Sequence, residues 1–136
     1  MIELTLAMAE RAVRAAQERA KVLGTPMTVT VVDEGGRLVL SARGDGTGFF
    51  TPETSRAKAV AAAAFRRATG EMGKLISDGS PFFLLMPTVV GGEALPTNGG
   101  VPIIRGGRVI GGIGCGGGTG EQDHECALAG AQTAVD

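Results

Sequence analysis

A block rich in glycine, residues 99–120, is followed at once by a run of acidic and polar side chains. The block has the sequence GGVPIIRGGRVIGGIGCGGGTG and holds eleven of the 23 glycines. Because glycine lacks a Cβ, backbone N–H groups can approach a ligand there, and a helix that starts nearby adds partial positive charge. The next five residues, Glu-Gln-Asp-His-Glu at 121–125, bring carboxylates and the only imidazole. Function is therefore expected first in this part of the chain.

Part of the block has the spacing of a dinucleotide-binding loop. Gly112, Gly114 and Gly117 form the pattern G-x-G-x-x-G between a predicted strand and a predicted helix. A dinucleotide fold also needs a second strand and an acidic residue about twenty positions further on to bind the ribose. The sequence offers neither after this helix, which argues against a dinucleotide site.

Three consecutive glycines remain a candidate nest for an anion. Gly116, Gly117 and Gly118 precede Thr119, the predicted N-cap of the last helix, so their N–H groups could converge on a carboxylate. The alternative is structural, because such glycines also let a strand turn tightly into a helix or let another subunit approach. The acidic residues that follow already place negative charge where an anion would bind.

A Glu-x-x-His spacing places Glu121 and His124 on one face of the last helix, as in metal carboxylate proteins. Such sites draw on several helices, and this chain has a single histidine. The favoured interpretation is therefore a solvated histidine in the first helical turn. A metal bound here would be shared between symmetry-related chains.

Cys115 lies between glycines just before the start of the last helix, a setting that lowers the pKa of a thiol and gives access to it. His124 is the only histidine available as a base for it. The alternative is a small buried cysteine, which is the commoner outcome and the expectation for Cys126. Both cysteines are expected as free thiols, because two cysteines in a reducing compartment do not make a disulfide framework.

Hydrophobic periodicity predicts the elements that position these residues. Apolar residues recur at steps of three and four over residues 6–23, which predicts an amphipathic helix ending at Gly24. Residues 27–33 and 37–43 are predicted to form a β-hairpin.

A second hairpin and a final helix follow from similar signals nearer the C-terminus. Residues 101–105 and 108–114 flank a two-residue glycine turn, which predicts the hairpin. Thr119 with Gln122 forms a predicted capping box for a helix that runs to about Ala134.

The middle of the chain is predicted from weaker signals. A helix should start at Thr51 and end at Gly70, with the small residues Ala57, Ala61, Ala64 and Ala68 on one face, and a short helical piece should cover residues 71–77. Residues 82–85 and 88–90 are predicted as one interrupted strand or two short ones. If this apolar run is buried inside the sheet, it belongs to the core. If it is exposed together with the alanine face, it suits a subunit interface.

These elements predict a single α+β domain of residues 1–136, with a central antiparallel sheet of about five strands and helices on its faces. Thirteen Lys and Arg against fourteen Asp and Glu give a net charge of −1 with no basic stripe, and Trp and Tyr are absent. Nucleic acid is therefore an unexpected partner. No signal peptide or membrane-spanning segment is recognised, so a cytoplasmic protein without a membrane partner is expected.

Four motifs in chain order resemble the GlcG/HbpS-type haem-binding (haem-degrading) family, which also occurs at the C-terminus of PduO-type proteins. They are GTPMTVTVVD at 24–33, the helix with Ala-Lys-Ala at 57–59, NGGVPI at 98–103, and VIGGIG at 109–114 leading to GGTGEQD at 117–123. The resemblance implies an α/β/α sandwich of profilin-like type, homo-oligomers of high order such as an octamer, and haem- or corrinoid-associated roles in some members. One fold can host unrelated functions, so it does not imply a single activity.

The first hypothesis is an oligomeric protein that binds haem or a related tetrapyrrole in an apolar pocket, with the propionates near the glycine loop and Lys58 or Arg43. Met72, Met86 or Cys115 could substitute for histidine as axial ligand, but each is more easily interpreted as a core or turn residue. The residues expected to bind the ligand are Gly99, Gly100, Gly116, Gly117, Gly118, Thr119, Arg43 and Lys58.

Two other hypotheses remain open. The chain could be an enzyme or accessory subunit of small-molecule catabolism, with Cys115, Glu121 and Asp123 as the catalytic candidates around a ligand other than haem. It could also be a structural homo-oligomer without catalytic activity, in which the glycine block packs against a neighbouring subunit.

Overall fold

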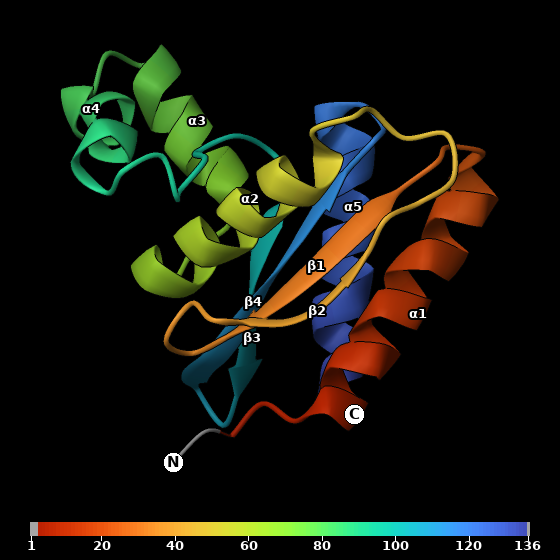
Figure 1. Ribbon diagram of the computed structural model, residues 1–136. Coiled ribbons are helices and arrows are strands. Elements are labelled where there is room, and N and C mark those ends of the chain that lie inside the picture. The colour runs from red at the N-terminus through yellow and green to blue at the C-terminus, as the bar shows by residue number, and fades with distance from the viewer. Residues whose placement is uncertain (1–2, 136) are drawn as a thin grey trace.

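The computed structural model describes residues 3–135, which form three layers with a sheet in the middle (Figure 1). Of the predicted domain, residues 1, 2 and 136 lie outside the described part. The elements in chain order are α1 (Leu6–Leu23), β1 (Thr28–Asp33), β2 (Leu38–Ala42), α2 (Thr51–Phe65), α3 (Thr69–Ser77), α4 (Pro81–Val89), β3 (Gly100–Arg105), β4 (Arg108–Gly116) and α5 (Gly120–Ala134).

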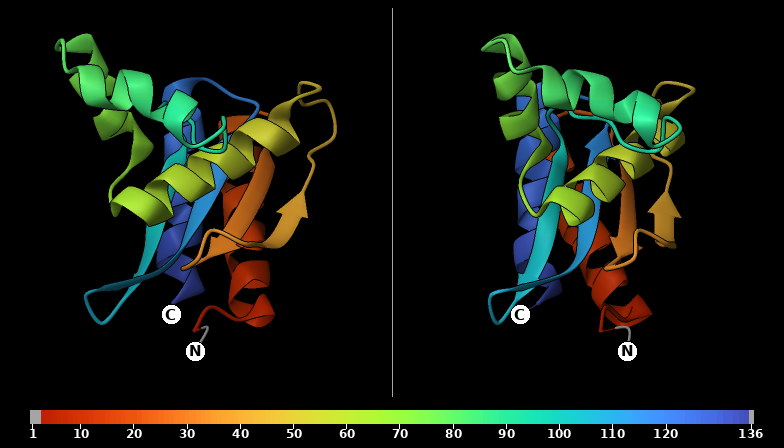
Figure 2. Two further views of the ribbon diagram at one scale, coloured as in Figure 1. Left: turned by 60° about the vertical axis from the view of Figure 1, so that its left-hand side comes forward. Right: turned by 90° about the vertical axis from the view of Figure 1, so that its left-hand side faces the viewer.

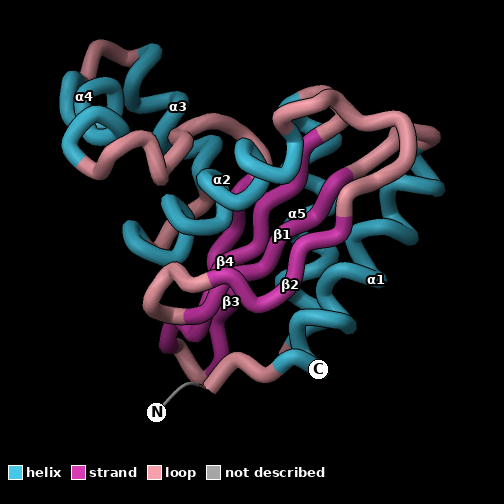
Figure 3. Tube along the Cα trace, in the orientation of Figure 1, coloured by secondary structure: helices cyan, strands magenta, loops and turns pink. Residues whose placement is uncertain are grey.

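The described residues form one antiparallel sheet with the strand order β2-β1-β4-β3. Both predicted hairpins are confirmed, since β1 pairs with β2 and β3 pairs with β4. The two hairpins join through β1 and β4 in the centre, so β2 and β3 are the edge strands (Figure 3). The α+β class with helices on both faces is confirmed, but the expectation of about five strands is wrong because the sheet has four.

The segment that was expected to add a further strand forms the helix α4, so the strand prediction for residues 82–85 and 88–90 is wrong. Pro81 occupies the start of the helix, where a proline costs no hydrogen bond, and Phe83 and Met86 are buried at the helical spacing of three. Pro87 lies inside the helix near its end. A short run in which nearly every residue is apolar carries no period, which is why strand and helix could not be told apart.

One face of the sheet packs on α1 and α5, and the largest cluster of buried residues lies there. Val29 and Val31 of β1 and Ile113 of β4 point to this side. The predictions for both helices are confirmed: α1 ends at Gly24 in the left-handed conformation, and α5 carries the capping box of Thr119 and Gln122. Figure 2 shows the two helices side by side behind the strands.

The other face packs on α2, which lies very close to β4. A Cβ on Gly112 or Gly114 would collide with the carbonyl oxygens of Ala59 and Ser55. The alanine-rich helix therefore packs very closely on the sheet of the same chain. The predicted end at Gly70 is wrong, since α2 ends at Phe65.

The small face predicted for α2 is also wrong in part. Ala61 is buried, but Ala64 is exposed and Ala57 is only partly buried. The buried residues of this helix are Ser55, Lys58, Ala59, Ala61, Ala62 and Ala63. Because both faces of the run are nearly all alanine, the sequence did not show which one meets the sheet.

The helices α3 and α4 form an arm that extends from one end of the molecule (Figures 1 and 2). A separate small core holds the arm together, with Met72, Phe83 and Met86 packed near Ala61 and Phe65 of α2. The outer sides of α4 stay exposed, including Phe82, Leu84, Leu85 and Val89 at 57%, 62%, 61% and 83%. Among the described residues, no helix has the length and apolar character needed to cross a bilayer.

Candidate functional site

A buried ion pair joins α2 and α5, which lie on opposite faces of the sheet. Lys58 Nζ lies 3.2 Å from Asp123 Oδ2 and donates a hydrogen bond of 2.9 Å to the Cys115 carbonyl oxygen. The two side chains are only 8% and 7% exposed. The pair lies where β3 begins and β4 ends, so it joins the three layers at one end of these strands.

Two of the glycines predicted to bind ligand instead make room for this pair. Gly99 has φ +122°, and a Cβ there would lie 2.9 Å from Lys58 Nζ and 2.7 Å from the Cys115 carbonyl oxygen. Gly100 is buried beneath the Lys58 carbonyl, and its N–H donates to Thr69 Oγ1 at 2.8 Å. Neither glycine is exposed to a ligand in the isolated chain.

The predicted anion nest is filled by a carboxylate of the chain itself. Gly118 N–H donates to Asp123 Oδ1 at 2.9 Å, and Thr119 N–H donates to Gln122 Oε1 at 2.9 Å. Gly116 is buried, while Gly117 is exposed with φ +135°. Burial raises the pKa of the Asp123 carboxyl, whereas the Gly118 N–H and the Lys58 ammonium lower it. The structural alternative for these glycines therefore describes the isolated chain better than the anion nest.

Cys115 is fully buried, so it is the small buried cysteine that the sequence analysis gave as the commoner outcome, and the alternative of an accessible thiol with a lowered pKa is wrong. Burial raises the pKa of the Cys115 thiol well above its usual range, and the nearby Cys126 and Asp123 raise it further, against a smaller opposing effect of Lys58. Cys126 is also buried, as predicted, and its pKa is raised to about 11. The effect of burial exceeds that of the nearby helix start, because a thiolate cannot be solvated there.

The Glu-x-x-His pair does not form a metal centre in the single chain. Glu121 is exposed and His124 is half-buried, and no ion pair joins them among residues 3–135. Within the same residues, no cluster of three or more His, Cys, Asp or Glu could hold a metal ion. The Nδ1 atom of His124 is nevertheless buried and has no hydrogen-bond partner in the described part of the chain.

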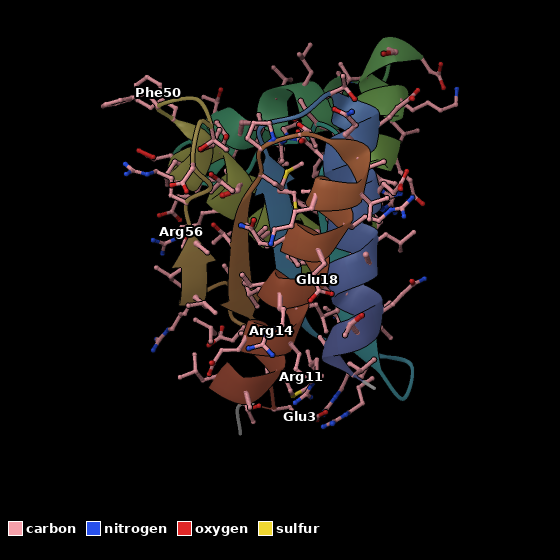
Figure 4. All side chains as sticks on the ribbon, turned by 90° about the vertical axis from the view of Figure 1, so that its right-hand side faces the viewer. Glu3, Arg11, Arg14, Glu18, Phe50 and Arg56 are labelled. Carbon is pink, nitrogen blue, oxygen red and sulfur yellow. The ribbon has the colours of Figure 1, made fainter. Side chains whose placement is uncertain are left out.

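Arg43 is exposed just after the end of β2. It borders a hollow of about 580 Å³ together with Phe49, Pro52 and the glycines of the loop at 44–48. Phe49 is 86% exposed and stacks edge-to-face on Phe50, which projects from the molecule in Figure 4.

Sequence reasoning missed a network of hydroxyl groups between β1 and α2. Thr30 Oγ1 lies 2.7 Å from Ser55 Oγ, and Thr28 Oγ1 lies 2.8 Å from Thr51 Oγ1. Thr28 also accepts a hydrogen bond from the Gly44 N–H at 3.1 Å, which fixes the start of the glycine-rich loop. The signal was present, because threonines two positions apart in a strand must point to the same face.

The chain matches one protein family over nearly its whole length. The model of the family described as haem degrading protein, HbpS-like, matches residues 4–132. An uncharacterised 15.0 kDa protein from the dhaT–dhaS intergenic region of Citrobacter freundii is 33% identical over 133 residues, which are 98% of this chain and 90% of that protein. Corrinoid adenosyltransferase PduO of Salmonella typhimurium is 34% identical over 122 residues, which are 90% of this chain but 35% of PduO.

Solved structures share the fold over the same length. A crystal structure of a PduOC complex with haem has a TM-score of 0.88 and 29% identity, and the match covers 99% of this chain and 96% of that one. A double mutant of Streptomyces reticuli HbpS has a TM-score of 0.86 and 32% identity, covering 97% and 87% of the two chains.

We predict that Lys58→Met destabilises the fold by about 3–5 kcal/mol, because it leaves the Asp123 carboxylate buried without its counter-charge. Urea unfolding followed by circular dichroism measures the loss. Adding Asp123→Asn to this variant should restore part of the stability, since a neutral amide needs no cation and can still accept from Gly118.

The matched control is Lys74→Met, which removes the exposed ion pair of Lys74 with Asp78. Its cost should stay below about 1 kcal/mol, because exposed pairs are screened by water. Equal losses in the two single variants would contradict the role given to Lys58.

We also predict that neither thiol of the folded chain reacts with a disulfide reagent such as DTNB at pH 8 within minutes. A thiol with the pKa of about 11 to which burial raises Cys126 is ~0.1% thiolate at that pH, and burial also raises the pKa of Cys115 well above its usual range. In strong denaturant, both thiols should react at once. One rapid equivalent from the folded chain would show that Cys115 or Cys126 is accessible after all.

Proposed function

The chain belongs to the HbpS-like family of haem degrading proteins, and we propose that it is a self-associating protein that binds haem or a related tetrapyrrole. The observation that carries the proposal is the likeness to the PduOC complex with haem, which extends over 99% of this chain at a TM-score of 0.88. At 29% identity this likeness supports a shared kind of ligand, whereas the residues that contact it have to be argued from this chain.

A tetrapyrrole needs an apolar slot, a donor atom for the metal and cations for its carboxylates. Lys58 does not fit the last requirement, because its ammonium is committed to Asp123 and to the Cys115 carbonyl. Arg43 is exposed and fits it better. When bound, haem would supply an iron centre for redox or oxygen chemistry, while the protein supplies binding and orientation.

The exposure of the side chains also narrows the choice of the iron ligand. Met72, Met86 and Cys115 are all buried in cores of the chain, with exposed fractions of 4% or less. His124 is half-buried, and its Nδ1 atom lacks a partner among the described residues. Of these four candidates, His124 is the only one whose side chain is partly exposed.

Self-association is proposed from the surface of α4. The residues from Gly79 to Gly92, GSPFFLLMPTVVGG, contain no charged side chain. Only Phe83 and Met86 of this helix are buried, and large apolar residues are exposed around the rest of it. A helix that is apolar all round is normally buried in a protein core, and exposed patches of this kind mark interaction sites. The proposed partner that covers this surface of α4 is a second copy of the chain.

The alternative of thiol-based catalysis gains no support from the geometry. The thiol of Cys115 is buried with a raised pKa, and the Asp123 carboxylate is bound to Lys58 and Gly118. Of the three catalytic candidates, only Glu121 is exposed.

We predict that titrating the purified protein with haemin at micromolar concentration produces a Soret band distinct from that of free haemin, saturating at a fixed ratio of haem to chain. Difference spectra against haemin in the same buffer measure this. An unchanged haemin spectrum throughout the titration would overturn the tetrapyrrole proposal and leave the fold and family assignment untouched.

We further predict that Leu85→Lys lowers the mass of the assembly, because it puts a charge into the apolar surface of α4 without disturbing the small core beneath. Size-exclusion chromatography with light scattering measures the mass against 13.7 kDa for one chain. Val22→Lys on α1, where the residue replaced is also apolar and 73% exposed, should leave the mass unchanged. A monomeric wild-type protein, or equal masses in all three proteins, would contradict α4 as the interface.

A further inference from the structure

An apolar groove lies between the edge strand β3 and the helix α5, on the side of the sheet away from α2. Its volume is about 450 Å³, and no charged side chain lines it. The lining consists of Val101, Pro102 and Ile104 from β3 and of Leu128, Ala131, Gln132 and Val135 from α5 and its C-cap. Four other hollows among the described residues are each bordered by charged side chains. This groove is therefore the one that suits an apolar occupant.

Within residues 3–135, the groove stays open to solvent. Ile104 and Leu128 in its walls are 46% and 38% exposed. The apolar helix α4 of the same chain does not cover it, because Phe83 and Met86 hold α4 near Phe65 of α2, on the other face of the sheet. Figure 2 shows the arm of α3 and α4 beside α2, with α5 beyond the strands. A second molecule has to supply whatever fills the groove.

The backbone of β3 does not suit an added strand. Pro102, in the middle of the strand, has no N–H to donate. The N–H of Gly100 already donates to Thr69 Oγ1 at 2.8 Å. A helix needs no hydrogen bonds from its neighbour, because its own N–H and C=O groups bind one another. The protein segment expected in the groove is therefore a helix with an apolar side.

The length of α4 matches that of the groove. The helix has nine residues, which span about 13 Å at 1.5 Å per residue. Leu128 and Val135 lie seven residues apart along α5 and its C-cap, which is about 10 Å. Val101 and Ile104 lie three residues apart along β3, which is also about 10 Å. About two turns of α4 can therefore lie along the groove.

Three exposed residues of α4 form a stripe on one side of the helix. Phe82, Leu85 and Val89 follow one another at steps of three and four, and each is more than half exposed. This is the spacing of the anchors by which an amphipathic helix enters an apolar groove. The stripe is separate from Phe83 and Met86, which are buried within the arm. It is free for a partner without any change in the chain that carries it.

The apolar area favours a partner that uses both surfaces. Covering three side chains of this size and the facing walls of the groove buries on the order of 800 Å². That is small for a specific interface, whose usual total is about 1,600 Å². A chain that gives its own α4 and receives that of a neighbour makes two such contacts and reaches this size. A second copy of the chain is the occupant that provides both.

Charges beyond the ends of the two surfaces are complementary. The first charged residue after α4 is Glu93, which is exposed and has no ion pair within residues 3–135. The residue that follows Ile104 is Arg105, which is half-exposed and whose ion pair with Glu3 is a long one of 3.8 Å. Opposite charges outside an apolar contact steer association and set its orientation. They favour the C-terminal end of α4 toward the Arg105 end of the groove.

Resting on the self-association proposed above, we propose that α4 of one chain lies in the groove between β3 and α5 of a second copy. Phe82, Leu85 and Val89 then pack against Ile104 and Leu128 of the partner subunit. The partner of α4 is the groove and not another α4. Because the two surfaces differ, the contact is heterologous, so each chain gives one arm and receives one.

The test charges each surface separately. Leu85→Lys changes the arm and keeps the groove, whereas Leu128→Glu changes the groove and keeps the arm. Each variant alone should weaken the affinity between chains at least tenfold, measured by light scattering over a range of concentrations. An equimolar mixture still holds one intact arm and one intact groove. It should form a species of two chains, one of each variant, which native mass spectrometry identifies by mass.

The two changes combined in one chain supply a matched control. Leu85→Lys with Leu128→Glu brings opposite charges together across the contact and should recover the assembly at low ionic strength. Leu85→Lys with Leu128→Lys brings like charges together and should stay dissociated. Circular dichroism checks that each variant is folded.

The outcomes separate this proposal from the self-association on which it rests. A monomeric wild-type protein would overturn both. Dissociation of Leu85→Lys with the wild-type mass in Leu128→Glu would keep α4 as an interface and overturn the groove as its partner. Dissociation of both single variants, with no recovery in the mixture or in the oppositely charged double variant, would also overturn the contact between these two surfaces.

Discussion

The buried ammonium of Lys58 sets conditions that much of the chain has to meet. A charge removed from water is tolerated only with an opposite charge and with satisfied hydrogen bonds. Here they come from Asp123 on α5 and from the carbonyl of Cys115 on β4. Because Lys58 lies on α2 and Asp123 lies on α5, the pair forms only if the two helices are held at the same end of the central strands. The first turn of α5 must therefore begin directly after β4, which the Gly118 N–H and the capping box ensure.

The glycine block is best understood as the consequence of this close packing. Gly99 leaves space for the Lys58 ammonium, and Gly114 lets α2 approach β4 at Ser55. At each of these positions a Cβ would enter space that a backbone or charged atom already fills. The same lack of side chains that suggested a ligand-binding loop is used to bring the layers together. A glycine cluster in a sequence reports close approach of some group to the backbone, and it cannot tell whether that group is a ligand or another part of the chain.

Features that depend on neighbouring residues could be predicted from the sequence, and features that depend on distant ones could not. The hairpins, α1 with its end at Gly24 and the cap of α5 at Thr119 follow from local patterns, and they are confirmed. The helix α4 was missed because its apolar run has no period, and its orientation is set by Met72 and Phe65 of other helices. Lys58 and Asp123 were both selected as functional, but as separate groups. Their pairing across 65 residues depends on the assembled sheet and has no local signal.

Because the buried polar groups bind one another, they limit where the chain can hold a ligand. The interior positions predicted as a site are satisfied within the fold, since Asp123 binds Gly118 and Lys58 while Thr69 binds Gly100. A ligand that displaced these contacts would leave a buried charge without its partner, which costs several kcal/mol. Binding is therefore favoured at apolar surfaces that stay exposed in the single chain, which are the outer face of α4 and the loop at Phe49. Members of one family can keep the same packed interior while the residues on these surfaces vary, so a family-wide fold can serve ligands held by different side chains.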